Sequence, residues 1–369
     1  MVALFAAALA ATAAERPMVD WVIPALATNQ PQTPEQAEEG RKSGRKLPPP
    51  EVLQPSLDAA LPPYQPRKEK LVATFHGGAS DVLSVLVQQW FEKFRTYHPE
   101  VQLSISPPYA GSLGAAELVK EKLDFVFVSR ELRPDDIKDF RAKFGYGPLS
   151  IPVCGGSYRT FGALDAVAFF VNRDNPIEKL SFDQIDAIYS STHLRGGKTA
   201  LKWGDLGLGG DWADKPIKAW GIKPWNGFEE FVRQRVLSAG GKRGEWRDDI
   251  SFEKLVFPMA KRVADDRYAI AYSGVAYLDQ GVRVLPLVAE AGDAPQAATY
   301  ENVALATYPL SRLIFFNVNK APGKPLPPAL DEFLRFVLSK EGQQVVLDHG
   351  TYVPLRAAQS RTSRILLEP

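Results

Sequence analysis

From Leu71 onward the chain alternates short apolar runs with small-residue turns and amphipathic helical segments. Residues 71–75, 101–105 and 124–128 are short runs rich in β-branched and aromatic side chains, which predicts buried strands. Apolar residues recur at the helical period between Val82 and Phe94. This alternation predicts a parallel sheet covered by helices, a class of fold that binds ligands at the carboxyl ends of its strands.

Composition sets the size of the core and excludes several classes of function. The 369 residues are 45% hydrophobic, which is enough for one large or two medium cores. The formal net charge is +1, with 44 basic and 43 acidic residues, so we expect no nucleic-acid partner. One cysteine excludes an internal disulfide, and the four histidines lack the short spacings of zinc sites. We therefore expect no metal and no cofactor.

The N-terminal region differs from the rest of the chain. Residues 1–14 are mostly apolar and end in small residues, which predicts a signal peptide and export, although no Lys or Arg precedes Arg16. The alternative is an ordinary apolar tail. Residues 15–68 alternate proline with charge and lack periodicity, which predicts a proline-rich linker or arm. No other apolar run reaches the roughly 20 residues of a membrane span.

Several blocks of sequence occur together in a recognisable order. They are 166–172, 175–177, 180–190, 268–274, Tyr308-Pro309-Leu310-Ser311-Arg312, 338–344 and Gly350-Thr351-Tyr352-Val353-Pro354-Leu355. Residues 180–190 are expected to form an amphipathic helix capped by a serine, Ser181. This set resembles the phosphate-binding periplasmic proteins, the PstS-like solute-binding components of ABC importers. The resemblance extends over roughly residues 71–355, and no single motif could imitate it.

The resemblance implies an α/β class II periplasmic-binding-protein fold, with two lobes and a hinge of two crossover strands. Lobe 1 would comprise residues 69–168 and 310–357, and lobe 2 residues 169–309, followed by a C-terminal tail at 358–369. The implied function is that of a monomeric, exported periplasmic protein, not an enzyme. It would capture an inorganic oxyanion, with phosphate the leading ligand, for an ABC permease in the inner membrane.

The turns after the lobe 1 strands are the candidate anion site. Unpaired backbone N–H groups at a helix start favour an anion, glycine allows close approach, and a serine hydroxyl adds a donor. Gly77-Gly78 is expected to end the first strand, and Ser80 or Asp81 to cap the helix that follows. The candidate ligand-binding residues of lobe 1 are Gly78, Ala79, Ser80, Asp81, Gly111, Ser112, Ser129 and Arg130.

Each residue has a structural alternative. Ser80 is equally suited to helix capping, and Asp81 to a first-turn carboxylate that the helix dipole favours. Arg130 offers a bidentate fork to an oxyanion, and its alternative is a surface salt bridge with Glu131 or Asp135.

The lobe 2 turn departs from the family pattern. Asn226 and Gly227 are the candidate ligand-binding residues there, but Asn226 stands in place of the family's serine and Phe228 in place of its threonine. The family's arginine is absent, and Lys223 is the only nearby cation. In lobe 1, Arg130 occupies about the place of the family's aspartate, which accepts a hydrogen bond from protonated phosphate. Sulfate, another oxyanion, an organic phosphate and a lost ligand therefore all stay open.

Two other functions are considered. A phosphoester hydrolase would need a base beside a nucleophile, and His76 is the histidine nearest to Ser80 in sequence. Cys154 is expected to be a buried small apolar residue. A two-lobed interaction or sensor protein would keep the same fold and use the proline-rich arm as its contact.

Overall fold

The computed structural model describes residues 57–105, 113–158, 164–224, 227–278 and 281–368. These residues form two compact units. Unit 1 consists of 57–157 together with 312–368, and unit 2 lies within 158–311. The chain therefore leaves unit 1, builds unit 2 and returns to complete unit 1.

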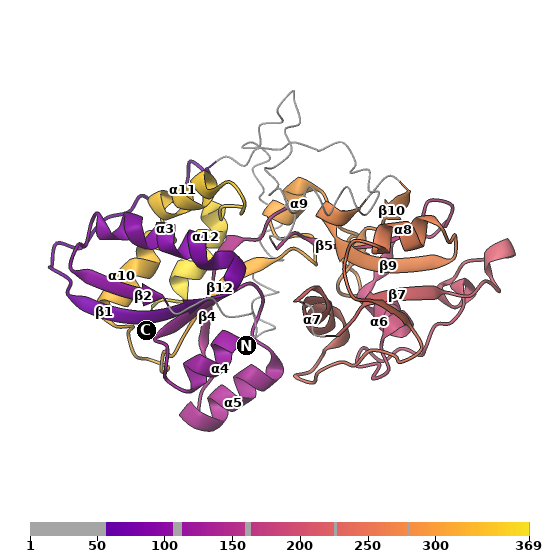
Figure 1. Ribbon diagram of the computed structural model, residues 1–369, viewed down its shortest axis with the longest axis horizontal. Coiled ribbons are helices and arrows are strands. Elements are labelled where there is room, and N and C mark those ends of the chain that lie inside the picture. The colour runs from indigo at the N-terminus through magenta and orange to yellow at the C-terminus, as the bar shows by residue number, and fades with distance from the viewer. Residues whose placement is uncertain (1–56, 106–112, 159–163, 225–226, 279–280, 369) are drawn as a thin grey trace. The chain divides into compact units, whose positions relative to one another are not determined.

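Unit 1 is built on a five-stranded sheet with one reversed strand (Figure 1). Its strands, in spatial order, are β2 (Val101–Ile105), β1 (Ala73–Ala79), β3 (Phe125–Val128), β12 (Leu313–Val318) and β4 (Leu149–Gly155). β1 is parallel to β2 and to β3, whereas β12 is antiparallel to both β3 and β4. The carboxyl ends of β1 to β4 therefore meet at one edge, where β12 begins.

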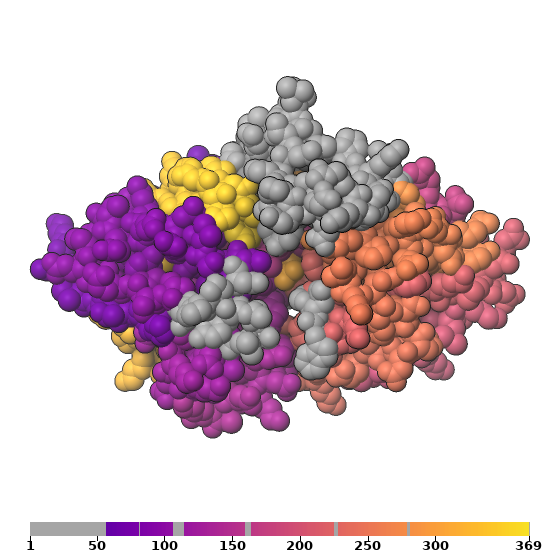
Figure 2. Space-filling model, in the orientation of Figure 1, coloured from indigo at the N-terminus to yellow at the C-terminus, as the bar shows by residue number. Residues whose placement is uncertain are grey.

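Helices cover both faces of this sheet. They are α3 (Ser84–Arg95), α4 (Leu113–Val119), α5 (Pro134–Phe144), α10 (Pro328–Val337), α11 (Lys340–His349) and α12 (Ala357–Ile365). On one face, the Trp90 ring stacks on Phe127 at 5.7 Å, and its indole N–H donates to the Gly342 carbonyl at 2.8 Å. Figure 2 shows the yellow C-terminal helices beside the indigo α3 in one continuous surface. Early and late parts of the chain thus share this core.

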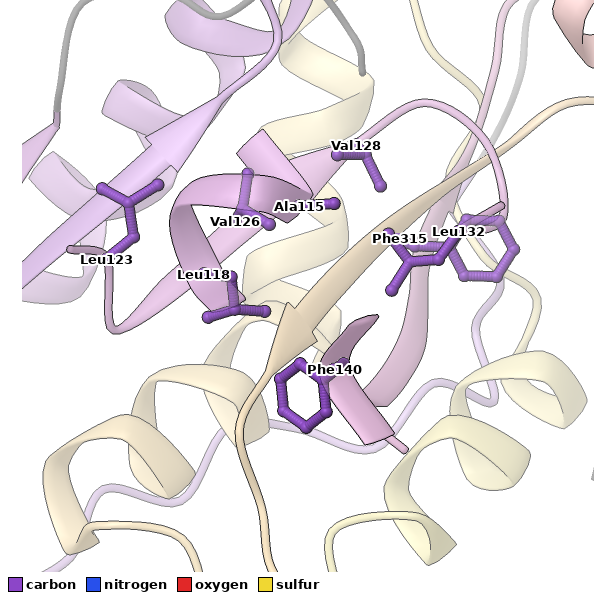
Figure 3. Close-up of a cluster of buried hydrophobic side chains, with 8 residues drawn as sticks. All are labelled: Ala115, Leu118, Leu123, Val126, Val128, Leu132, Phe140 and Phe315. Atoms are coloured by element: carbon purple, nitrogen blue, oxygen red, sulfur yellow. The ribbon is translucent and has the colours of Figure 1, made fainter. Parts of the chain in front are cut away.

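The other face carries a second apolar cluster, drawn in Figure 3. Successive strand residues point to opposite faces, so Val126 and Val128 turn away from Phe127 and pack under α4 and α5. The cluster comprises Ala115, Leu118, Leu123, Val126, Val128, Leu132, Phe140 and Phe315. It holds β3, whose carboxyl end carries two of the predicted site residues, between two packed layers.

Unit 2 repeats the same plan with its own sheet. The strands, in spatial order, are β10 (Val282–Val284), β5 (Val167–Asn172), β9 (Ala269–Gly274), β7 (Lys218–Ile222) and β8 (Ser251–Glu253). β5 is antiparallel to β9 and β10, whereas β7 is parallel to β8 and β9. β6 (Leu180–Ser181) and β11 (Leu287–Val288) form a small second sheet. The helices are α6 (Phe182–Tyr189), α7 (Gly227–Val232), α8 (Met259–Ala264) and α9 (Tyr300–Ala304).

Two α/β units joined by two chain crossings confirm the predicted architecture. The reversed strands, β5 and β12, are the first strands that the chain forms after each crossing. The predicted cap of α6 is also confirmed, because the Ser181 hydroxyl accepts from the Gln184 N–H at 3.1 Å.

The prediction that Gly77-Gly78 ends the first strand is wrong. β1 continues through both glycines to Ala79 and pairs there with β3. The reason is packing, because a Cβ on Gly77 would overlap the Phe125 ring. Glycine at this position lets an aromatic side chain cross the strand.

The described end of the predicted arm packs on unit 1. The Tyr64 hydroxyl donates to Glu332 at 2.7 Å, Arg67 pairs with Asp331 at 2.6 Å, and Asp58 accepts from the Ala357 N–H at 2.8 Å. Most of the predicted C-terminal tail is α12, which starts at Ala357. The units change over at 157/158 and 311/312, whereas the lobe boundaries expected from the sequence are 168/169 and 309/310.

The predicted signal peptide and the arm up to residue 56 lie outside the described residues. Among the helices that the structure describes, none is long and apolar enough for a membrane crossing.

Candidate functional site

The carboxyl edge of the unit 1 sheet gathers buried polar residues from neighbouring strands. Ser80 directly follows β1, Ser129 and Arg130 follow β3, and Arg312 directly precedes β12. Each is 93% or more buried, with exposed fractions of 2% for Ser80, 7% for Ser129, and 5% for both arginines. The strand order β1-β3-β12 places these residues side by side. Three of the predicted site residues thus lie together.

Ser80 is held by its backbone, not by its side chain. Its N–H donates to the Phe127 carbonyl at 3.1 Å, and its carbonyl accepts from Leu83 at 2.9 Å. It precedes a 3-10 turn at Asp81–Leu83, and its hydroxyl makes no capping hydrogen bond, so the predicted capping role is wrong. The Ser80 Oγ is buried without a hydrogen-bond partner in the described structure. Such a hydroxyl is free to bond to a ligand.

Arg130 lies in a cluster with Arg133 and Asp136. Its Nη1 donates to the Glu131 carbonyl at 2.7 Å and lies 3.7 Å from the Asp136 carboxylate. Asp136 also accepts from Arg133, at 3.1 Å from Nε and 3.0 Å from Nη2. Two guanidinium groups therefore share one carboxylate. Arg130 is buried beside Asp136, so it does not lie at the surface, as the alternative of a surface salt bridge expected.

Arg312 is a candidate that the sequence reasoning missed. Its Nη2 donates to the Ser129 carbonyl at 3.5 Å, and its own carbonyl accepts from the Gly156 N–H at 2.7 Å. The available signal was its place in the Tyr308–Arg312 block, directly before a strand. Its proximity to Ser129 depends on the antiparallel pairing of β12 with β3, which the sequence alone does not give.

The remaining predicted residues divide into two groups. Gly78 and Ala79 are the last residues of β1, paired with β3, and Gly227 begins α7. Gly111, Ser112 and Asn226 lie outside the part of the chain that the structure describes. The backbone of Asp81 is described, but its side chain is not.

The corresponding region of unit 2 contains an arginine that is neutralised internally. α7 continues into a π-helical turn at Arg233–Leu237. The Arg233 Nε donates to Glu229 at 2.6 Å, and a second guanidinium nitrogen contacts the same carboxylate oxygen. The Trp246 indole N–H donates to that oxygen at 2.6 Å. Lys223 is therefore not the only nearby cation, but Arg233 is fully occupied by the buried Glu229 carboxylate.

The hydrolase alternative finds little support in the geometry. His76 lies four residues before Ser80 on β1, which corresponds to about 13 Å of strand. Its Nδ1 lies 2.5 Å from the Ser104 hydroxyl. Cys154 is fully buried in β4 as predicted, and burial raises the pKa of its thiol well above the ordinary value. In the described residues, His, Cys, Asp and Glu form no cluster that could hold a metal.

The comparisons with known proteins agree with this architecture. Residues 65–341 match the family model described as a PBP superfamily domain. The phosphate-binding protein PstS of Pseudomonas aeruginosa is 36% identical over 304 residues, which cover 82% of this chain and 89% of that protein.

Solved structures show the same fold at much lower identity. An ABC-type phosphate transport receptor from Vibrio cholerae is 17% identical, with a TM-score of 0.52 over 76% of this chain and 100% of that chain. PstS from Borrelia burgdorferi is 14% identical, with a TM-score of 0.54 over 77% and 99% of the two chains. The chain therefore belongs to the PstS-like family of phosphate-binding proteins within the periplasmic-binding-protein (PBP) superfamily.

Proposed function

We propose that this chain is an exported solute-binding protein that captures inorganic phosphate and delivers it to an ABC permease in the inner membrane. The proposal assigns it no catalytic role and treats it as a monomer in the periplasm. Phosphate is chosen because the Pseudomonas aeruginosa relative is a phosphate-binding protein that aligns with most of this chain.

One observation carries the proposal: the Ser80 hydroxyl and the Arg130 guanidinium are buried at the same sheet edge. A buried cation is costly unless an opposite charge faces it. Asp136 lies 3.7 Å from Arg130 and also binds Arg133. A bound oxyanion would accept from the Arg130 guanidinium and from Ser80 Oγ. Gly78, Ala79, Asp81, Gly111, Ser112, Ser129, Asn226 and Gly227 stay as predicted contacts.

The direct test is calorimetric titration of the purified chain with phosphate. We expect Arg130→Ala to weaken phosphate binding by about 10- to 100-fold, because a hydrogen bond to a charged group contributes about 1.5–3 kcal/mol. Arg141→Ala is the matched control, since Arg141 is an exposed arginine on α5 of the same unit. An unchanged affinity in Arg130→Ala, or no phosphate binding by the wild-type chain, would contradict the proposal.

A thermal-shift panel of phosphate, sulfate, arsenate and molybdate separates the other functions. A ligand that binds only the folded state raises the melting temperature according to RT ln(1 + [L]/Kd). No shift with any of the four anions would favour the interaction or sensor protein. Turnover of a chromogenic phosphoester that is lost in Ser80→Ala would favour the hydrolase.

A further inference from the structure

We propose that unit 2 carries a second binding site, for an organic carboxylate, in a surface hollow at the amino ends of β7 and β9. The hollow has a volume of about 400 Å³ and is lined by Asp211, Trp212, Lys215, Arg267 and Tyr268. The length of β9, roughly 17 Å, separates it from the carboxyl edge of the unit 2 sheet. The proposal concerns unit 2 alone and does not depend on phosphate binding.

The walls of the hollow are two half-buried aromatic rings that unit 2 holds in place. Trp212 ends a 3-10 turn at Gly210–Trp212, and its ring meets the Tyr268 ring edge-to-face at 5.4 Å. The fully buried Trp203 also packs against Trp212, at 6.2 Å. The Trp203 indole N–H donates to the Tyr268 carbonyl at 3.2 Å. Both walls are therefore positioned without a ligand.

The Arg267 guanidinium lies over both of these rings. It is 5.3 Å from the centroid of Trp212 and 5.7 Å from that of Tyr268. A guanidinium that stacks through its face keeps the N–H groups of its edge for an acceptor, and this fork matches the two oxygens of a carboxylate. Stacking also restricts the side chain, so less conformational entropy is lost when a ligand binds.

Arg267 differs from other stacked cations of the chain, which have a carboxylate of their own. Arg262 lies over Trp220 at 5.2 Å and pairs with Glu253 at 2.8 Å. Two further stacked cations also have carboxylate partners: Lys143 and Arg195. Within the described residues, no carboxylate lies at ion-pair distance from Arg267. Its fork is therefore available to a carboxylate from outside the chain.

The acidic neighbours of Arg267 in the sequence are engaged elsewhere. Asp266 pairs with Lys218 at 2.6 Å, and its Oδ1 accepts from the Tyr268 N–H at 3.0 Å. Asp265 pairs with Lys261 at 2.6 Å. Neither carboxylate therefore has to leave an ion pair with Arg267 when a ligand binds.

Lys215 gives the hollow a second cation. The adjacent Asp214 pairs with Lys202 at 3.0 Å, and Lys215 has no ion-pair partner in the part of the chain that the structure describes. Asp211 lines the hollow but lies beyond ion-pair distance of both cations. Its negative charge repels a multiply charged anion more than a singly charged one. The hollow therefore suits a carboxylate better than fully ionised phosphate.

The aromatic walls indicate what the carboxylate is attached to. Small-molecule sites have volumes of about 300–1,000 Å³ and combine apolar or aromatic walls with a few polar groups that fix the orientation of the ligand. Here the cations fix the carboxylate, and Trp212 and Tyr268 offer apolar surface to its carbon body. An aromatic acid such as benzoate meets both requirements.

The experiment titrates the full chain with benzoate, benzamide and acetate in a buffer free of other carboxylates. The indole N–H signals of the seven tryptophans are followed by nitrogen-15 NMR, and the signal missing in Trp212→Phe identifies Trp212. We expect benzoate to shift this signal and to bind about 10- to 100-fold more tightly than benzamide, which lacks the charge. Acetate, which lacks the ring, should bind about 2- to 10-fold more weakly than benzoate.

Two arginine variants form the matched comparison. Arg267→Gln should weaken benzoate binding by about 10- to 100-fold. Arg262→Gln should leave it unchanged, because Arg262 is also stacked on a ring but pairs with Glu253 and does not line the hollow. Lys215→Gln tests the second cation and should weaken benzoate binding by a smaller factor.

The outcomes separate the carboxylate site from its alternatives. Benzoate binding that is absent, equal to that of benzamide, or unchanged in Arg267→Gln would overturn the proposal. A capped dipeptide with one glutamate side chain distinguishes the source of the carboxylate. Tighter binding of the dipeptide than of benzoate would assign the site to an acidic segment of a partner protein and would support the carboxylate class. Failure to bind phosphate would remove the proposed function and leave this site intact.

Discussion

The two units each bury an arginine, but the carboxylates around these two arginines are arranged differently. In unit 1, Arg130 and Arg133 share the Asp136 carboxylate, and Arg312 contacts the carbonyl of Ser129, the residue before Arg130. In unit 2, Arg233 pairs with the buried Glu229 carboxylate, with Glu245 3.1 Å away on its exposed side. The same residue type therefore serves as a potential anion contact in one unit and as a structural ion pair in the other.

This difference shows why counting cations near a predicted turn is a poor guide to ligand binding. What matters is whether a carboxylate from the same protein already neutralises the cation. By this criterion we expect the charged contribution to phosphate binding to come from unit 1. The variants below test that asymmetry, from the largest expected effect to the smallest.

The largest effect is expected from Glu229→Ala. This change leaves Arg233 buried without its carboxylate, and breaking a buried pair in this way costs about 3–5 kcal/mol. The free energy of unfolding, measured in urea, should fall by that amount. Glu230→Ala is the control, because the neighbouring Glu230–Arg243 pair is partly exposed and is expected to contribute only about 0–1 kcal/mol. If the two variants lost equal amounts of unfolding free energy, Glu229–Arg233 would not be the buried structural ion pair that distinguishes unit 2 from unit 1.

A smaller loss is expected from crowding at one glycine of each sheet. A Cβ at Gly77 would overlap the Phe125 ring, and one at Gly274 would overlap the Asp165 carboxylate, which accepts from the Ala276 N–H at 2.8 Å. Each alanine variant should lose about 1–3 kcal/mol in urea unfolding. Gly147→Ala has room and should be neutral. Rescue of Gly77→Ala by Phe125→Leu would identify the ring as the cause, and a neutral Gly77→Ala would contradict the packing account.

Ser80→Ala is expected to separate binding from stability. Loss of one donor should weaken phosphate binding by roughly 2- to 10-fold, because a neutral hydrogen bond contributes about 0.5–1.5 kcal/mol. Stability should not fall, since the hydroxyl has no described partner. Ser339→Ala is the counterpart: this buried serine caps α11 through the Gly342 N–H at 3.2 Å, so it should lose about 1 kcal/mol of stability and no affinity. If Ser80→Ala lost stability and kept its affinity for phosphate, the assignment of Ser80 as a ligand contact would be contradicted.

The smallest effect is expected from pH. Burial lowers the pKa of His349 in unit 1 below its ordinary value. The unfolded chain therefore takes up the proton first, and stability is lost as pH falls below the ordinary histidine pKa of about 6.5. Thermal unfolding from neutral to mildly acidic pH should show His349→Asn losing less stability than the wild type, by under about 1 kcal/mol. A larger acid loss in the variant would reverse the sign and contradict the assignment.

The sequence predicted the elements well because their signals are local. The strand at 101–105 and the Ser181 cap of α6 depend on residues within one element, and both are found as predicted. The path of β1 through Gly77 depends on Phe125, which lies 48 residues away. Likewise, Arg312 reaches Ser129 only through the pairing of β12 with β3. The Glu229–Arg233 pair had a local i,i+4 signal that the search for a ligand-binding arginine passed over.

The position of β12 determines the order in which the two units can fold during synthesis. This strand lies between β3 and β4, so until Leu313 and its successors have been synthesised the first sheet consists of two separate parts. The intervening segment, by contrast, holds all five strands of its own sheet and can form as soon as it emerges. The unit that carries the proposed anion site is therefore the last to be completed. A nascent chain that stops before residue 313 would hold a finished second unit and an unfinished first one.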